Sequence, residues 1–100
     1  MSLSEWGYQF EGPFSSPDQV PAKAGVYTVW CRQNNTWSSL DIGQAENMRE
    51  RLTNHDRAIC WKRHCGASIH FYVVAIPSEA ERRNLEQKIR QDKNPPCGEI

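Results

Sequence analysis

Four side chains of this 100-residue chain carry groups that phosphodiester hydrolysis requires: Tyr27, Arg51, His55 and Glu86. That reaction needs an activated water, positive charge around the phosphorus and a route for the leaving oxygen. Arg51 offers a permanently charged fork of donors for a phosphate, and Glu86 offers a hard oxygen ligand for Mg²⁺ or Mn²⁺. Tyr27 could activate water if nearby cations lower its pKa far below about 10, with His55 as a proton relay or a second phosphate donor.

Two predicted strands position Tyr27. The run 25–31 is dense in β-branched and aromatic residues and precedes the turn-forming residues 33–35, which is typical of a hairpin. Residues 36–42 form the expected partner strand. Strand alternation places Tyr27 on the opposite face from Val26 and Thr28, so Tyr27 can face out of the sheet.

Two predicted helices position the other three side chains. Apolar residues at helical spacing predict a helix over 45–55, and Arg51 and His55 lie side by side on its border. A looser segment over 56–66 leads to a strong strand pattern over 67–76. A capping box then predicts a helix over 78–92, which carries Glu86. The expected fold is α+β, with a small three-stranded, largely antiparallel sheet flanked by helices.

The order and spacing of these groups resemble the GIY-YIG nuclease family. Gly25-Val26-Tyr27 stands where the family has its first motif, and Asp41-Ile42-Gly43 stands where it has its second, followed by Arg51, His55 and Glu86. The resemblance covers residues from about 25 to 96. It implies a metal-dependent endonuclease domain that hydrolyses DNA with one Mg²⁺ or Mn²⁺. It also implies a metal ligand, Glu86, and a catalytic set, Tyr27, Asp41, Arg51, His55 and Glu86.

The chain departs from the family pattern at two places. Asp41 replaces the second motif's tyrosine, and Cys97-Gly98 follow the last proline where the family often has an asparagine. Asp41 could join Glu86 as a second metal ligand, act as the base, or end the strand and cap the following turn. The alternative function is therefore a catalytically inactive module of the same fold that binds nucleic acid or a protein.

The charge balance restricts how DNA can bind. Twelve basic and twelve acidic residues give a net charge of zero, so a nucleic-acid footprint must be local. The basic stretch 49–64, which includes Trp61, is the candidate footprint, although an ordinary solvated face would look the same. Its predicted nucleic-acid contacts are Arg49, Arg57, Lys62 and Arg63. Because no separate DNA-binding domain is recognised, specificity is expected to come from a protein partner or from the structure of the substrate itself. The oligomeric state is left open.

Length predicts one domain, with residues 1–24 as a lead-in segment that packs on a nuclease-like domain over 25–100. No stretch reads as an export signal or a membrane span, which predicts a cytoplasmic location and thiols rather than disulfides at the four cysteines. The spacing of Cys60, His64 and Cys65 lacks the paired short loops of structural zinc sites. A thiol or zinc protein built on this cluster is the third alternative.

Overall fold

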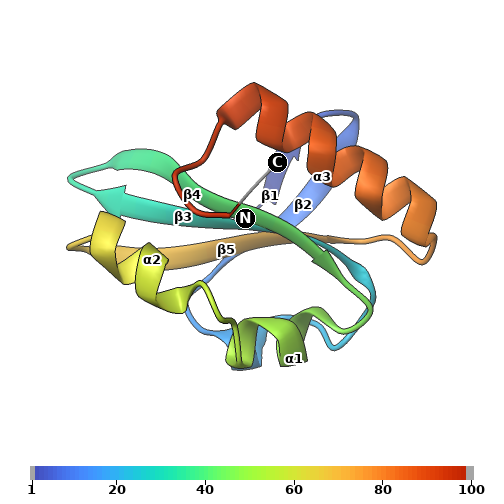
Figure 1. Cartoon of the computed structure of the whole chain (residues 1–100), viewed down its shortest axis with the longest axis horizontal. Helices are drawn as coiled ribbons and strands as arrows, with labels where there is room; N and C mark the ends of the chain where they lie inside the picture. The colour runs from blue at the N-terminus through green and yellow to red at the C-terminus, as the bar shows by residue number, and fades with distance from the viewer. Residues whose placement is uncertain (1, 99–100) are drawn as a thin grey trace.

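The computed structural model describes residues 2–98, which form an α+β fold with a curled, five-stranded antiparallel sheet and three helices (Figure 1). The strand order across the sheet is β1-β2-β5-β3-β4. The strands are β1 (Ser2–Glu5), β2 (Tyr8–Phe14), β3 (Gly25–Gln33), β4 (Thr36–Ala45) and β5 (Ser68–Ala75). The helices are α1 (Met48–Thr53), α2 (Ala58–His64) and α3 (Glu79–Lys93), and a short 3-10 turn, η1, spans Pro17–Gln19.

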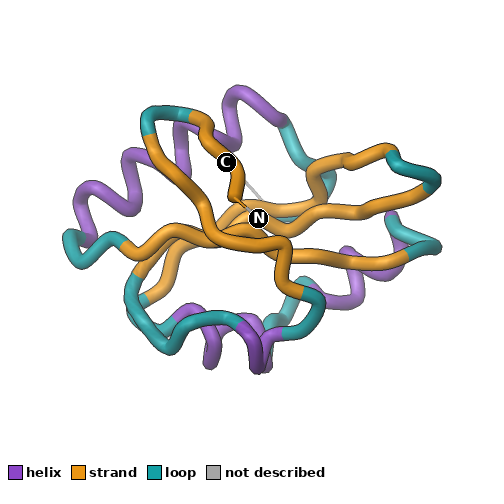
Figure 2. The backbone as a smooth tube through the Cα atoms, turned by 180° about the vertical axis from the view of Figure 1, so that it is seen from behind, coloured by secondary structure: helices purple, strands orange, loops and turns teal. Residues whose placement is uncertain are grey.

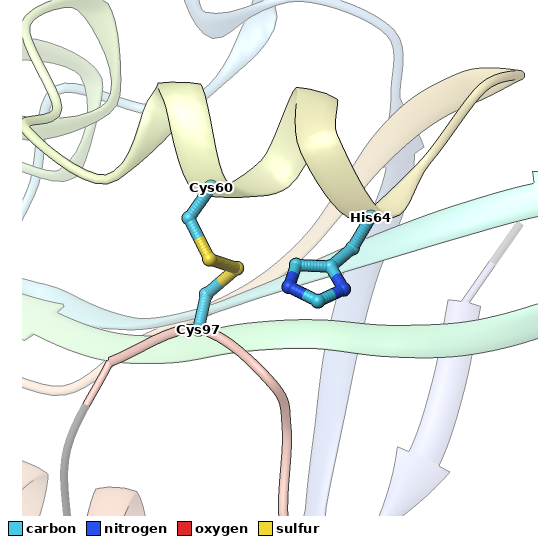
Figure 3. A group of neighbouring side chains, drawn as sticks. All are labelled: Cys60, His64 and Cys97. Atoms are coloured by element: carbon cyan, nitrogen blue, oxygen red, sulfur yellow. A yellow bond between two sulfur atoms is a disulfide. The ribbon is translucent and has the colours of Figure 1, made fainter.

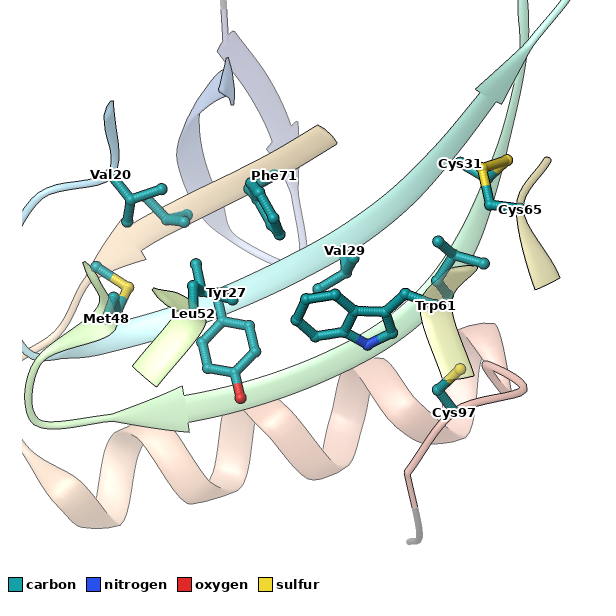
Figure 4. Close-up of a cluster of buried hydrophobic side chains, with 12 residues drawn as sticks. Val20, Tyr27, Val29, Cys31, Met48, Leu52, Trp61, Cys65, Phe71 and Cys97 are labelled. Carbon is teal, nitrogen blue, oxygen red and sulfur yellow. A yellow bond between two sulfur atoms is a disulfide. The ribbon is translucent and has the colours of Figure 1, made fainter. Parts of the chain in front are cut away.

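The helices cover both faces of the sheet. Helix α3 lies across one face and α1 and α2 lie on the other (Figures 1 and 2). One core cluster, which includes Phe10, Val26 and Leu85, fills the space beneath α3. The second cluster, which includes Tyr27 and Trp61, lies beneath α1 and α2 (Figure 4). Side chains on the two faces of β3 therefore pack into two separate cores, as the alternation of side chains along a strand requires.

The predicted hairpin is confirmed and is longer than expected. Asn34 and Asn35 both have positive φ, 52° and 68°, the pattern of a type I′ turn, whose twist matches that of the flanking strands. The pairing of β3 with β4 shifts register between Val29 and Trp30, which marks a bulge. The register sets Tyr27 opposite Gly43. The first and second motifs of the family resemblance thus lie on adjacent strands.

The sheet has five strands rather than the predicted three, because residues 2–14 form β1 and β2 where a lead-in was expected. Trp6 and Gly7 have φ of 55° and 80° and turn the chain between these strands. Phe10 is fully buried, and Tyr8 lies two residues before it on the same face of β2. The strand continues through Gly12 and Pro13. Because glycine and proline are uncommon inside strands, these two residues hide the strand pattern in the sequence.

Both predicted helices are present, and the first is shorter than predicted. Helix α1 begins after Asn47, whose side chain caps it, and ends before His55. Helix α3 begins after Ser78, which accepts from the amide of Glu81 as the capping box predicts. Helix α2 lies in the segment that was expected to be looser. The helix is not evident from the sequence, because Ile59, an apolar residue that is 71% exposed, interrupts the amphipathic pattern. Among residues 2–98, no helix has the length and apolar character to cross a membrane.

The cysteines form two disulfides, so the prediction of free thiols is wrong for this structure. Cys31 of β3 pairs with Cys65, which follows α2, and Cys60 of α2 pairs with Cys97. Each disulfide joins elements more than thirty residues apart in the sequence. Residue 1 of the predicted lead-in and residues 99–100 of the predicted 25–100 domain lie outside the described residues.

Candidate functional site

The Tyr27 phenol and the His55 ring form the centre of the candidate site. Their Oη and Nε2 atoms lie 2.7 Å apart, and the two rings meet edge to face. Tyr27 is only 1% exposed and His55 is 7% exposed, because α1 and α2 cover this face of the sheet. Burial raises the pKa of Tyr27 to about 12, although the charges of Arg51 and Arg57 act in the opposite direction. The phenol is therefore neutral at physiological pH.

His55 is neutral as well. Burial, followed by the charges of Arg51 and Arg57, lowers its pKa to about 4. The 3.5 Å approach of its Nδ1 atom to Asp56 is therefore not an ion pair at neutral pH. Nδ1 accepts from the Arg57 amide at 3.1 Å, and this hydrogen bond assigns the ring proton to Nε2. Nε2 then donates to Tyr27 Oη, which directs the hydroxyl proton of Tyr27 away from His55.

Arg51 reaches the same place from α1. Its guanidinium donates to the Asp56 carboxylate at 2.9 Å and is 36% exposed. Burial raises the pKa of the Tyr27 phenol, and the nearby charge of Arg51 partly offsets this by lowering it. Arg51 also lines a hollow at the start of α1 together with Glu50 and Asn54. The structure thus brings together three of the predicted catalytic side chains, and one of them remains open to solvent.

Gly43 makes room for the phenol. A Cβ at this position would overlap the Oη and ring atoms of Tyr27, which lies against β4 at the residue it opposes in the register. The second motif therefore requires a glycine at this position for a steric reason, which is the close approach of the Tyr27 side chain. Any side chain here would push the phenol away from His55.

Asp41 has a different setting from that of a metal ligand or a catalytic base. It is fully buried, and its two oxygens accept from four donors, all at 2.7–2.8 Å. The donors are Arg57 Nε, Trp61 Nε1, Arg90 Nη2 and the Ile42 amide. These contacts use the acceptor positions of the carboxylate, which leaves none for a metal or a reacting water. Asp41 is therefore the centre of a buried ionic network, and it does not serve as a second metal ligand beside Glu86.

Arg90 connects this network to Glu86. Arg90 also donates to the carbonyl oxygens of Ile42 and Cys97, and its Nε lies 3.4 Å from a Glu86 oxygen. Glu86 therefore lies on the side of α3 that faces β4, with its side chain 27% exposed. Tyr27 approaches β4 from the face covered by α1 and α2, whereas Glu86 approaches it from the face covered by α3. The edge strand β4 separates Glu86 from Tyr27, Arg51 and His55.

The predicted nucleic-acid footprint is only partly free to bind. Arg57 is held by Asp41, whose hydrogen bond and charge raise the pKa of Arg57 against the opposing effect of burial. Arg49 donates to the Val20 carbonyl at 2.7 Å. Lys62 and Arg63 are exposed near the end of α2. Two of the four predicted contacts are thus engaged in holding the fold.

The sequence did not reveal the two residues that hold Asp41 from a distance. Arg90 and Trp61 bind Asp41 across 49 and 20 residues. Arg90 has a local signal, because it lies one helical turn after Glu86 on α3. Such spacing is typical of a surface ion pair, yet the Arg90 side chain is only 4% exposed.

A second hollow lies on the α3 face of the sheet, away from Tyr27. It has a volume of about 560 Å³. Its aromatic walls are Trp30, Trp37 and Tyr72, and its charged groups are two basic residues, Arg32 and Lys93, and one acidic residue, Glu5. The Arg32 guanidinium lies 5.6 Å from the centre of the Trp37 ring. The combination of flat aromatic walls with cations suits a ligand that has both a planar ring and negative charge.

Comparisons of this chain with protein-family models, curated proteins and solved structures found no match. The function of this chain is therefore inferred from its residues and their geometry.

Proposed function

We propose that this chain is a small GIY-YIG-type endonuclease domain that hydrolyses DNA phosphodiester bonds with one Mg²⁺ or Mn²⁺. The observation that carries the proposal is the 2.7 Å contact between Tyr27 and a neutral His55 within the field of Arg51. The order of the motifs along the chain supports it, since the same three side chains belong to the family resemblance.

Arg51 has the right exposure to bind the scissile phosphate. Its present partner, Asp56, is 74% exposed, and an exposed ion pair of this kind is weak enough to be exchanged for a phosphate. Tyr27 would act as a neutral hydroxyl, because its pKa of about 12 excludes a phenolate at neutral pH. With His55 donating to its oxygen, the phenol directs its own proton toward a phosphate or water oxygen.

A single divalent cation would bind at Glu86, on the α3 side of the edge strand β4, and a phosphate held by Arg51 would reach the ion around that edge. Magnesium sites that act on phosphates commonly use one or two carboxylates and complete the shell with water and substrate oxygens. Glu86 is partly exposed, and its contact with Arg90 is long at 3.4 Å, so the carboxylate can turn to a metal. When bound, the ion would stabilise the charge that develops on the phosphoryl and leaving oxygens. Asp41 takes no part, because its oxygens are occupied.

A cleavage assay tests this function. Purified protein is incubated with linear, flapped, branched and single-stranded DNA in Mg²⁺, in Mn²⁺ and with a chelator. We expect metal-dependent cleavage that Tyr27→Phe and Arg51→Ala each slow by roughly 10²–10³, the usual effect of losing one transition-state donor. Glu86→Ala should abolish it, whereas Glu79→Ala, a change on the same helix at an exposed ion pair, should not. No cleavage of any DNA form in either metal would overturn the proposal.

The second candidate is a nucleic-acid-binding module of the same fold that does not cleave. Two observations favour it. Tyr27 is almost entirely buried, so a phosphate has little access to its hydroxyl, and Asp41 replaces a family tyrosine with a structural ion pair. The hollow bounded by Trp37, Arg32 and Lys93 offers a surface for an unpaired base and its phosphate.

Binding without cleavage is measured by fluorescence anisotropy with a labelled single-stranded oligonucleotide in chelator. Stacking of a base on an aromatic ring contributes about 1–3 kcal/mol, so Trp37→Ala should weaken binding by roughly fivefold or more. Ile59→Ala, which removes an exposed apolar side chain from α2, serves as the control and should leave affinity unchanged. Equal affinity of the Trp37 variant and the parent protein would exclude this surface.

A further inference from the structure

The disulfide between Cys60 and Cys97 has a third potential metal ligand beside it. Cys60 and His64 lie four residues apart on α2, so their side chains leave the same face of the helix. Figure 3 shows the His64 ring next to the disulfide, on the side of α2 that faces Cys97. The ligand atoms of the three residues all lie within 4.8 Å of one another.

We propose that Cys60, His64 and Cys97 bind a zinc ion when their disulfide is reduced. Two thiolates and an imidazole are ligands that Zn²⁺ prefers, at about 2.3 Å for sulfur and about 2.0–2.1 Å for nitrogen. A tetrahedral site with these bond lengths separates its ligand atoms by roughly 3.5–4 Å. The side chains therefore need only small movements to reach that arrangement. The fourth position is left to water or another small ligand.

The reaction that opens the site is a two-electron reduction. An external dithiol attacks the disulfide through its thiolate, passes two electrons and two protons to Cys60 and Cys97, and becomes a disulfide itself. Zinc binding then displaces the two thiol protons, which leave to solvent, and binds a neutral His64. The pair is thus a disulfide under oxidising conditions and a metal site under reducing ones.

The backbone keeps Cys97 in place after reduction. Its amide donates to the Leu40 carbonyl at 3.0 Å, and its carbonyl accepts from Arg90 at 3.2 Å. Helix α2 is held near it through Trp61 and Arg57, which both bind Asp41. The ligands of the reduced site are therefore held in place by contacts that do not depend on the disulfide.

The other disulfide provides an internal contrast. Cys60, His64 and Cys97 are the one group of three or more potential ligands found together in residues 2–98. Cys31 and Cys65 lack a third ligand and are buried in the core beneath α1 and α2. His64 is exposed and Cys60 is partly exposed, which provides an ion with a route from solvent.

Titration of the full chain with Co²⁺ tests the proposal, because cobalt reports the ligand type and geometry of a zinc site by its absorption. The protein is reduced with a phosphine, which adds no thiol, and its fold is followed by circular dichroism. We expect one equivalent of Co²⁺ to produce a thiolate charge-transfer band and the visible bands of a tetrahedral ion. Zn²⁺ should remove these bands, and it should raise the melting temperature of the reduced protein.

Variants separate this site from adventitious binding. Cys60→Ser and Cys97→Ser should each abolish the charge-transfer band or reduce it by about half, and His64→Ala should weaken binding by more than about tenfold. The double change Cys31→Ser with Cys65→Ser should keep the spectrum. The proposal is overturned if the reduced protein binds no Co²⁺, if zinc does not stabilise it, or if the spectrum depends on Cys31 and Cys65. DNA cleavage has no part in any of these readouts.

Discussion

Replacing Asp41 should destabilise the fold, and the structure sets the scale of the loss. Asp41→Ala removes the partner of two arginines. Arg57 is 28% exposed and can turn to water, but the Arg90 side chain is only 4% exposed and would stay buried without its carboxylate. Removal of one member of a buried ion pair costs about 3–5 kcal/mol. Because one guanidinium can be solvated again, we expect a loss near the lower end, about 3 kcal/mol.

Unfolding by denaturant, followed by circular dichroism with the disulfides intact, measures this loss. For a domain of this size, about 3 kcal/mol corresponds to a fall in melting temperature of roughly 12 °C or more. Arg90→Met added to Asp41→Ala should recover part of the stability, because it removes the buried charge that has lost its partner. Asp56→Ala is the matched control: it breaks an ion pair at an exposed carboxylate and should have no measurable effect.

The outcome distinguishes the two roles considered for Asp41. A metal ligand or general base can be removed with loss of activity and little loss of stability. If Asp41→Ala unfolds within about 1 kcal/mol of the parent protein, or if Arg90→Met deepens the loss, the buried-network argument fails.

Three further predictions follow from the same geometry. Gly43→Ala should cost about 1–3 kcal/mol by forcing the Tyr27 phenol from its place, measured by denaturant unfolding; an unchanged midpoint would contradict the packing argument. Because burial lowers the pKa of His55 to about 4, the unfolded chain binds a proton between about pH 6.5 and 4 that the folded chain does not, so stability should fall as pH falls through that window. His55→Gln should flatten this part of the profile of melting temperature against pH, and a profile identical to the parent's would contradict the assignment. The double change Cys31→Ser with Cys65→Ser opens a loop of 34 residues and should lower the free energy of unfolding by about 4 kcal/mol, by the chain-entropy relation. The loss is measured from the unfolding midpoint under oxidising conditions. A loss below about 1 kcal/mol would show that this disulfide contributes little to stability.

The local patterns of the sequence determine the central part of the fold. Alternating β-branched and aromatic residues specify β3 and β5, and the Asn34-Asn35 turn specifies the hairpin that joins β3 to β4. Ser78 and its capping partner specify the start of α3. These elements were predictable because each depends on residues within a few positions of one another, where periodicity and turn chemistry act directly.

The first two strands and α2 were not predictable in the same way. Gly12 and Pro13 obscure the alternation in β2, which is stabilised by pairing with β5 some sixty residues away. Helix α2 spans only seven residues and exposes Ile59, so its sequence carries a weak helical pattern. Packing of Trp61 on the core, and not local propensity, holds this helix in place.

The site shows the same division. The types and spacing of Tyr27, Arg51 and His55 are visible in the sequence, and they do lie together in the structure. The role of Asp41 is not visible there, because its arginine partners are 16 and 49 residues away and only the packing of α2 and α3 around β4 brings them to it. The cysteine pairing likewise requires distances between Cα atoms, which no spacing of four cysteines can supply. Tertiary structure alone decides which charged side chains face solvent and which are buried as ion pairs.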